Sequence, residues 1–273
     1  MTMHSGRALT TFLAIAGAVP VWSGLHYGRG GGATAAAPGD GATIRFFRNP
    51  ATVAAFTATD LDGGRVSSDA WNGKVIIVNF WATWCPPCRA EIPDLVALQN
   101  KYRDTLQIVG VSEDEAPPEE VKRFAAAHQI NYPVVMTNKE LQRLFPGVQA
   151  LPTSFIINRE GKLVQKHVGM LSPALTELEA RALSGLPVSA SIEQVDQAKG
   201  LSLENGAQLM EIPGVQLAAL SPAKRAEALQ KLNAQPCTCG CDLTVAKCRV
   251  DDPNCGVSLP LARQIVQQIA ENK

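Results

Sequence analysis

Residues 74–93 read KVIIVNFWATWCPPCRAEIP and carry the strongest structural signals of the chain. Residues 74–81 form a continuous, mostly apolar run, which is typical of a strand buried on both faces of a sheet. Pro86 and Pro87 suit the first turn of a helix, and apolar residues then recur at helical spacing to about residue 102. The sequence therefore predicts a buried strand that leads directly into a helix.

Cys85 and Cys88 lie at this junction from strand to helix. Two thiols separated by two residues at a helix start can form a disulfide within one turn. The unpaired N–H groups and the positive end of the helix stabilise a thiolate, most strongly at the first position. We therefore predict a redox-active pair in which Cys85 is the nucleophile and Cys88 is the deeper, resolving thiol. A C-x-x-C pair on its own could also be half of a zinc site.

Strand and helix patterns alternate along the chain after the dithiol. The expected elements are a strand at 106–111, a helix at 118–127, short elements at 134–136 and 138–145, a hairpin of 154–158 with 162–168, and a helix from Ser172 to Leu183. This order predicts a mixed α/β sheet that is covered on both faces.

Two motifs together resemble a known family. WATWCPPCRAEIP at 81–93, which follows KVIIVNF, and LPTSFIINREGKLV at 151–164 resemble the TlpA/ResA/DsbE thioredoxin-like proteins, over about residues 50–185. The resemblance implies a thioredoxin-like fold and a thiol-disulfide oxidoreductase that needs no dissociable cofactor. It also implies reduction of client disulfides, as in the assembly of cytochrome c or copper sites, with electrons from a membrane thiol-disulfide donor. A disulfide-forming oxidase is an alternative that would differ in its redox potential and in its redox partner. A peroxidase is disfavoured, because the Thr-x-x-Cys context of peroxidases is absent before Cys85.

The resemblance implies a substrate-binding surface beside the dithiol. Pro152 would follow a cis peptide bond, which is uncommon and usually positional. The backbone of Leu151 would then face an extended substrate segment. Trp84 is expected over the mouth of the active site, whereas Trp81 is expected in the core.

Glu91 is the candidate for proton transfer. It lies three residues beyond Cys88 on the predicted helix and therefore shares its face. The resemblance implies that it assists deprotonation of the deeper thiol, and a solvated surface carboxylate is the alternative. Ordinary thioredoxins carry a buried Asp, which accepts a proton, at the position of Asn79. Because this chain lacks that acid, more of the proton chemistry is expected to fall on Glu91.

The N-terminal region predicts export from the cytoplasm. Residues 8–27 carry no charge except a possible one on His26, and they are long enough to span a bilayer. We expect an uncleaved anchor or a cleaved signal peptide, and therefore a location in the bacterial periplasm or cell envelope. Lys and Arg total 25, as do Asp and Glu, so no charge excess favours nucleic acid as a partner.

These patterns divide the chain into five expected segments. They are a signal anchor or signal peptide (1–28), a flexible linker (29–48), a thioredoxin-like domain (49–186), a linker or wrap (187–220) and a small helical Cys-rich unit (221–273).

The last segment contains a cluster of cysteines: Cys237, Cys239, Cys241, Cys248 and Cys255. One interpretation is a small helix pair held by disulfides, because the segment is too short for a large core. The odd number would leave one thiol free to exchange with Cys85 or to pair with another chain. Clustered thiolates also suit copper(I) or zinc, so a metal-handling protein is the competing functional class. A tail that relays electrons or docks a partner is a further alternative.

Overall fold

The central sheet is built around β5 (Val75–Trp81), the apolar strand that the sequence predicts. In the computed structural model, which describes residues 41–197 and 206–272, every side chain of β5 is buried. The strand pairs in parallel with β6 (Leu106–Ser112) and antiparallel with β9 (Thr153–Ile157). Because β5 has a neighbour on each side, its backbone groups are paired within the sheet, as an apolar environment requires.

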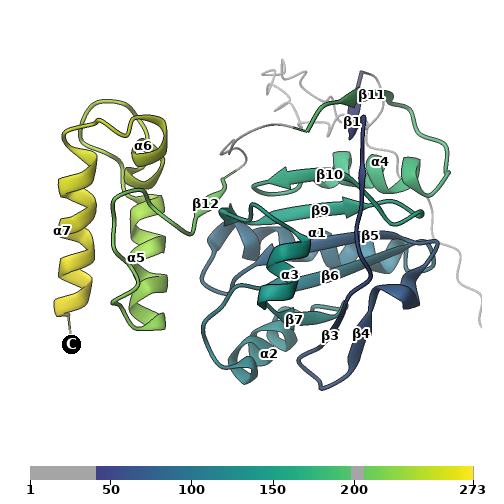
Figure 1. The fold of residues 1–273 in the computed structure, drawn as a ribbon, viewed down its shortest axis with the longest axis horizontal. Helices are drawn as coiled ribbons and strands as arrows, with labels where there is room; N and C mark the ends of the chain where they lie inside the picture. Colours follow the sequence, from purple (N-terminus) through teal and green to yellow (C-terminus); the bar gives the residue numbers. More distant parts are fainter. Residues whose placement is uncertain (1–40, 198–205, 273) are drawn as a thin grey trace, which may run out of the picture. The chain divides into compact units, whose positions relative to one another are not determined.

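The complete sheet has six strands in the order β2-β10-β9-β5-β6-β7 (Figure 1). β7 (Val134–Met136) extends its parallel side, whereas β10 (Lys162–Val168) and β2 (Ala51–Thr52) extend its antiparallel side. The predicted mixed sheet and the predicted hairpin of β9 and β10 are confirmed.

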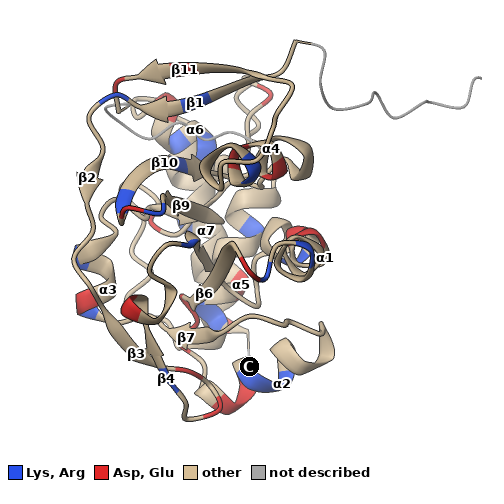
Figure 2. Ribbon diagram, turned by 90° about the vertical axis from the view of Figure 1, so that its right-hand side faces the viewer, with Lys and Arg blue, Asp and Glu red and all other residues tan. Residues whose placement is uncertain are grey.

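Helices cover both faces of this sheet. α1 (Pro86–Lys101), α2 (Pro118–Ala127) and α4 (Pro173–Leu183) lie on one face, and α3 (Lys139–Leu144) lies on the other (Figures 1 and 2). Acidic and basic residues are interspersed on the helices in the view of Figure 2.

Neighbouring residues of β5 pack against these opposite layers. The ring of Trp81 lies 5.5 Å from Phe124 of α2, whereas the ring of Phe80 lies 5.9 Å from Phe145, which follows α3. Trp81 is 2% exposed, which confirms its expected place in the core. Successive strand residues point to opposite faces, so one strand serves two cores.

Two short pairings lie outside the central sheet. β3 (Thr57–Thr59) pairs with β4 (Arg65–Ser67), which leads into a 3-10 helix at Ser68–Trp71. β1 (Thr43–Phe47) pairs in parallel with β11 (Ser191–Val195).

The pairing of β1 corrects two of the expected segments. We expected a flexible linker at 29–48, but residues 43–47 form a strand in which Ile44 is fully buried. The expected wrap at 187–220 contains its partner, β11, 148 residues further along the chain. A pairing over this separation has no local sequence signal.

Three helices and one short strand follow. They are β12 (Gln208–Leu209), α5 (Pro222–Ala234), α6 (Val245–Asp251) and α7 (Ser258–Glu271). The pattern of apolar residues after Ser221 and after Ser258 predicts α5 and α7, whereas α6, among the cysteines, is not predicted. The helices share a small apolar core that includes Leu229, Leu232, Val245, Ala262 and Ile265.

The expected membrane anchor at 8–27 lies outside the described residues. Within residues 41–197 and 206–272, no helix combines the length and apolar character that a membrane crossing needs.

The aromatic cluster beneath α3 yields a test of the fold. Phe145 is fully buried and packs against Phe56, Phe80 and Phe155. Because truncation leaves a cavity, we expect Phe145→Ala to lower the free energy of unfolding in urea by about 3–5 kcal/mol. Ile192→Ala, at a side chain that is 55% exposed, is the control and should change it little. Equal losses in the two variants would contradict this packing.

Candidate functional site

The two cysteines of the motif form a disulfide at the start of α1. Cys85 is the N-cap residue, and its Sγ accepts a hydrogen bond from the backbone N–H of Cys88 at 3.3 Å. The expected position at a strand-to-helix junction is confirmed. Both residues are fully buried, so exposure does not distinguish a nucleophilic from a resolving sulfur in this state.

A buried carboxylate holds the loop that precedes the dithiol. Asp114 accepts hydrogen bonds from the backbone N–H of Thr83 at 2.9 Å, from its hydroxyl at 2.6 Å, and from Ser112 Oγ at 2.8 Å. Asp114 is not among the site residues that the sequence predicts. The available signal was an acid placed two residues after a buried strand that runs parallel to β5.

The Leu151–Pro152 peptide bond is cis, which confirms the expectation from the resemblance. Leu151 belongs to the two-residue strand β8 (Ala150–Leu151), which directly precedes β9. The hydroxyl of Thr153 donates to the carbonyl of Ala150 at 2.7 Å and so closes the turn around the proline.

The chain itself pairs with the backbone in front of this proline. β12 runs antiparallel to β8, with Gln208 opposite Leu151. The pairing continues to Met210, whose N–H donates to the carbonyl of Gln149 at 3.1 Å. The strand edge that the resemblance assigns to substrate is therefore occupied by residues 208–210 of the same chain.

The same segment also reaches the dithiol loop. A Cβ placed on Gly206 would lie 3.7 Å from Cβ of Pro87, so the backbone passes closely beside the residues between the two cysteines. The side-chain amide of Gln230, on α5, donates to the carbonyl of Trp84. The half-buried Trp84 contacts both apolar cores and lines a groove of about 1440 Å³.

Glu91 is buried under α1 in a polar network. It is 3% exposed, which excludes the alternative of a solvated surface carboxylate. Its carboxylate accepts hydrogen bonds from Asn79 Nδ2 at 2.8 Å and from the N–H of Leu171 at 3.0 Å, while Asn79 also donates to Ser154 Oγ at 2.9 Å. Burial raises the pKa of Glu91 from 4.5 to about 7, against the lowering effect of these hydrogen bonds. The group can therefore gain or lose a proton near neutral pH.

The C-terminal cysteines are free thiols, which differs from the interpretation of a helix pair held by disulfides. Four of them, Cys237, Cys239, Cys248 and Cys255, have sulfur atoms within 4.8 Å of one another. Among the described residues, these four cysteines form a group that could hold a metal ion.

The raised pKa of Glu91 predicts a specific pH dependence of stability. A folded-state pKa above the unfolded value means that the folded protein binds this proton more tightly. The contribution of Glu91 to stability is therefore fully present below pH 4.5 and is lost as the pH rises through about 7. We expect the free energy of unfolding of the oxidised protein, measured in urea, to fall between pH 4.5 and 7 by on the order of 3 kcal/mol more than that of Glu91→Gln. Glu120→Gln, at an exposed carboxylate, should follow the unsubstituted protein. Parallel curves for the unsubstituted protein and Glu91→Gln would contradict the buried, shifted carboxylate.

The chain is similar to proteins of known class. Residues 51–166 match the AhpC/TSA family. The thioredoxin-like protein YneN of Bacillus subtilis is 34% identical over 119 residues, which are 43% of this chain and 69% of YneN. The thiol-disulfide oxidoreductase ResA of Halalkalibacterium halodurans is 32% identical over 124 residues, which are 45% of this chain and 69% of that protein.

One solved structure is similar to about half of this chain. The thiol:disulfide interchange protein of the thioredoxin family from Chlorobium tepidum is 36% identical and superposes with a TM-score of 0.48, covering 50% of this chain and 98% of that one. The family match ends at residue 166, before the C-terminal cysteines. Together with the disulfide at the start of α1, the sequence relatives decide the class: the chain belongs to the TlpA/ResA/DsbE-like family of thioredoxin-fold thiol-disulfide oxidoreductases.

Proposed function

We propose that this oxidoreductase works outside the cytoplasm and reduces disulfides in client proteins. The observation that carries the proposal is the Cys85–Cys88 disulfide at a helix N-terminus, above a buried carboxylate that titrates near neutral pH. The clients are proteins whose cysteines must be reduced before a haem or copper site is assembled. A membrane thiol-disulfide donor returns the electrons.

The first step is attack by reduced Cys85. The N-terminal end of α1 and the N–H of Cys88 favour a negative charge on its sulfur. The thiolate forms a bond to one sulfur of the client disulfide, and the other client sulfur leaves as a thiolate that takes a proton. The product is a mixed disulfide between enzyme and client.

The second step returns the enzyme to the state that the structure contains. Glu91, in its ionised form, accepts the proton of Cys88 through a direct or water-mediated contact. The Cys88 thiolate then attacks Cys85, the Cys85–Cys88 bond forms, and the second client sulfur is released. Two electrons have moved from the dithiol to the client, and the donor must supply two electrons and two protons for the next cycle.

Client binding uses the backbone edge of β8. An extended client segment would pair with Leu151, as the resemblance implies, and side-chain contacts would follow along the groove next to Trp84. That edge holds β12 in this structure, and Cys85 is fully buried. A client therefore reaches the dithiol only after β12 has moved away from β8.

The order of attack can be tested by trapping. We expect Cys88→Ser, reduced and mixed with a disulfide-containing test protein, to accumulate a mixed disulfide, because the resolving thiol is missing. Cys85→Ser should accumulate none at this site. Mass spectrometry of the tryptic peptide 75–89 distinguishes this adduct from adducts of the C-terminal cysteines. An adduct on Cys88 in Cys85→Ser, with none on Cys85 in Cys88→Ser, would reverse the assignment.

The cover by β12 predicts a gain of activity. Met210→Pro removes the N–H that donates to Gln149, a hydrogen bond of about 1 kcal/mol, which corresponds to about a fivefold larger open population. We expect the rate of client reduction and the rate of alkylation of reduced Cys85 to rise by about this factor.

Met210→Leu keeps the N–H and an apolar side chain, so it is the matched control and should leave both rates unchanged. Equal rates in Met210→Pro and Met210→Leu, with both proteins folded, would show that β12 does not limit access.

A further inference from the structure

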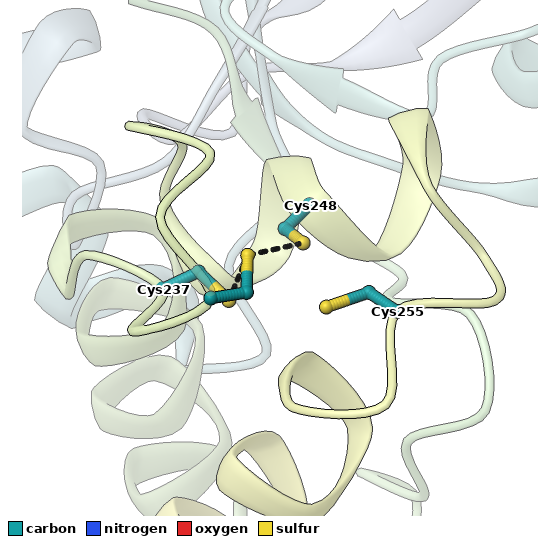
Figure 3. A group of neighbouring side chains, drawn as sticks. Cys237, Cys248 and Cys255 are labelled. Carbon is teal, nitrogen blue, oxygen red and sulfur yellow. Dashed lines mark hydrogen bonds between the residues drawn. The ribbon is translucent and has the colours of Figure 1, made fainter.

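Four of the C-terminal cysteines converge on one point. The Sγ atoms of Cys237, Cys239, Cys248 and Cys255 all lie within 4.8 Å of one another (Figure 3). The distance between sulfur atoms is 3.3 Å for Cys237 and Cys239, and 3.9 Å for Cys239 and Cys248. In Figure 3 the sulfur of Cys255 points from the opposite side toward this group.

One of the four side chains comes from α6, and the other three come from the loops that join α6 to α5 and to α7. Cys237 and Cys239 follow α5, Cys248 lies within α6, and Cys255 precedes α7. The loop after α5 is held in place, because the N–H of Cys237 donates to the carbonyl of Leu243 at 2.8 Å. One ion at the common point would therefore connect three helices that share only a small core.

The spacing of the sulfur atoms fits a single tetrahedral ion. With metal–sulfur bonds of about 2.3 Å, neighbouring sulfur atoms of a zinc tetrathiolate lie about 3.8 Å apart. The distances of 3.3 and 3.9 Å, and the upper limit of 4.8 Å for the whole set, lie around this value.

The surroundings provide compensation for a negative centre. Four thiolates and one divalent cation carry a net charge of −2. The backbone N–H of Ser258 donates to Cys255 Sγ at 3.4 Å, and Ser258 Oγ accepts from the guanidinium of Arg249 at 3.3 Å. Arg249 is 5% exposed and forms no ion pair within the described residues. A buried cation without a counter-charge is costly, and an anionic centre next to it would lower that cost.

We propose that Cys237, Cys239, Cys248 and Cys255 bind one zinc ion as a closed tetrathiolate site that joins α5, α6 and α7. Binding replaces the thiol protons, which are released to solvent, and no atom changes its oxidation state. Because all four positions of the ion are filled by protein, the role is structural, and the ion takes no part in thiol-disulfide exchange at Cys85 and Cys88.

The fifth cysteine provides a matched control within the same segment. Cys241 Sγ lies 3.0 Å from Cys239 Sγ, but Cys241 is not a member of the group in which all distances are within 4.8 Å. Its replacement by serine should therefore leave the zinc site intact, whereas replacement of a member should destroy it.

The test uses the full chain, purified under reducing, oxygen-free conditions and supplied with zinc. We expect one zinc per chain by elemental analysis in the unsubstituted protein and in Cys241→Ser. Cys248→Ser and Cys237→Ser should lose the metal. Cobalt in place of zinc should give the visible bands of a tetrahedral thiolate complex in the first two proteins only. Circular dichroism and reversible oxidation of the Cys85/Cys88 pair show whether each variant is folded.

Several results would overturn the proposal. The first is the absence of zinc and cobalt from the folded, reduced protein. The second is retention of the metal in folded Cys248→Ser, or loss of the metal in folded Cys241→Ser. The third is stoichiometric binding of copper in preference to zinc. Where a variant does not fold, chelation of the unsubstituted protein decides: removal of zinc should make four further thiols reactive toward alkylation, and an unchanged number of reactive thiols would contradict the site.

Discussion

The burial of β5 in the middle of the sheet is the constraint on which the active site depends. Its residues alternate between two apolar layers, with Phe80 facing the aromatic cluster beyond α3 and Trp81 facing α2. A strand fixed in this way leaves little freedom for the residues that follow it, and Asp114 restrains them further through Thr83. Cys85 is thereby placed at the N-cap of α1, where a thiolate is stabilised. The same strand carries Asn79, which donates to Glu91, so the sheet positions both the dithiol and the carboxylate that we propose as its proton acceptor.

The C-terminal part of the chain covers the redox centre. β12 adds to the edge beside the cis proline, Gln230 reaches the carbonyl of Trp84, and both cysteines are fully buried. Leu209 belongs to the small core of α5, α6 and α7, so the strand that covers the dithiol is anchored in the unit that carries the cysteine cluster. The stability of that unit and the accessibility of the dithiol are therefore coupled through β12.

The sequence predicted the parts of the fold whose signals are local. The apolar run of β5, the prolines at the start of α1 and the turn between β9 and β10 each specify their own conformation, and the cis bond at Pro152 followed from the resemblance. The pairings of β1 with β11 and of β12 with β8 were missed because they join short, partly polar segments far apart in the sequence. The burial of Glu91 depends on the N–H of Leu171, 80 residues away, which helical spacing does not reveal. Cysteine spacing likewise left open which of the five thiols belong together, and only the fold separates Cys241 from the other four.

An equilibrium redox titration of the full chain shows whether Cys85 and Cys88 form a reversible redox centre that works as a reductant. The protein is equilibrated in glutathione or dithiothreitol buffers, alkylated and digested, and the oxidised fraction is read from the tryptic peptide 75–89, which contains both cysteines. We predict one reversible two-electron transition with a potential nearer to that of reducing thioredoxins, about −270 mV, than to that of strong protein oxidants, about −120 mV. A potential near the oxidants would reverse the direction of the reaction, and the absence of a reversible two-electron transition would contradict the redox centre itself.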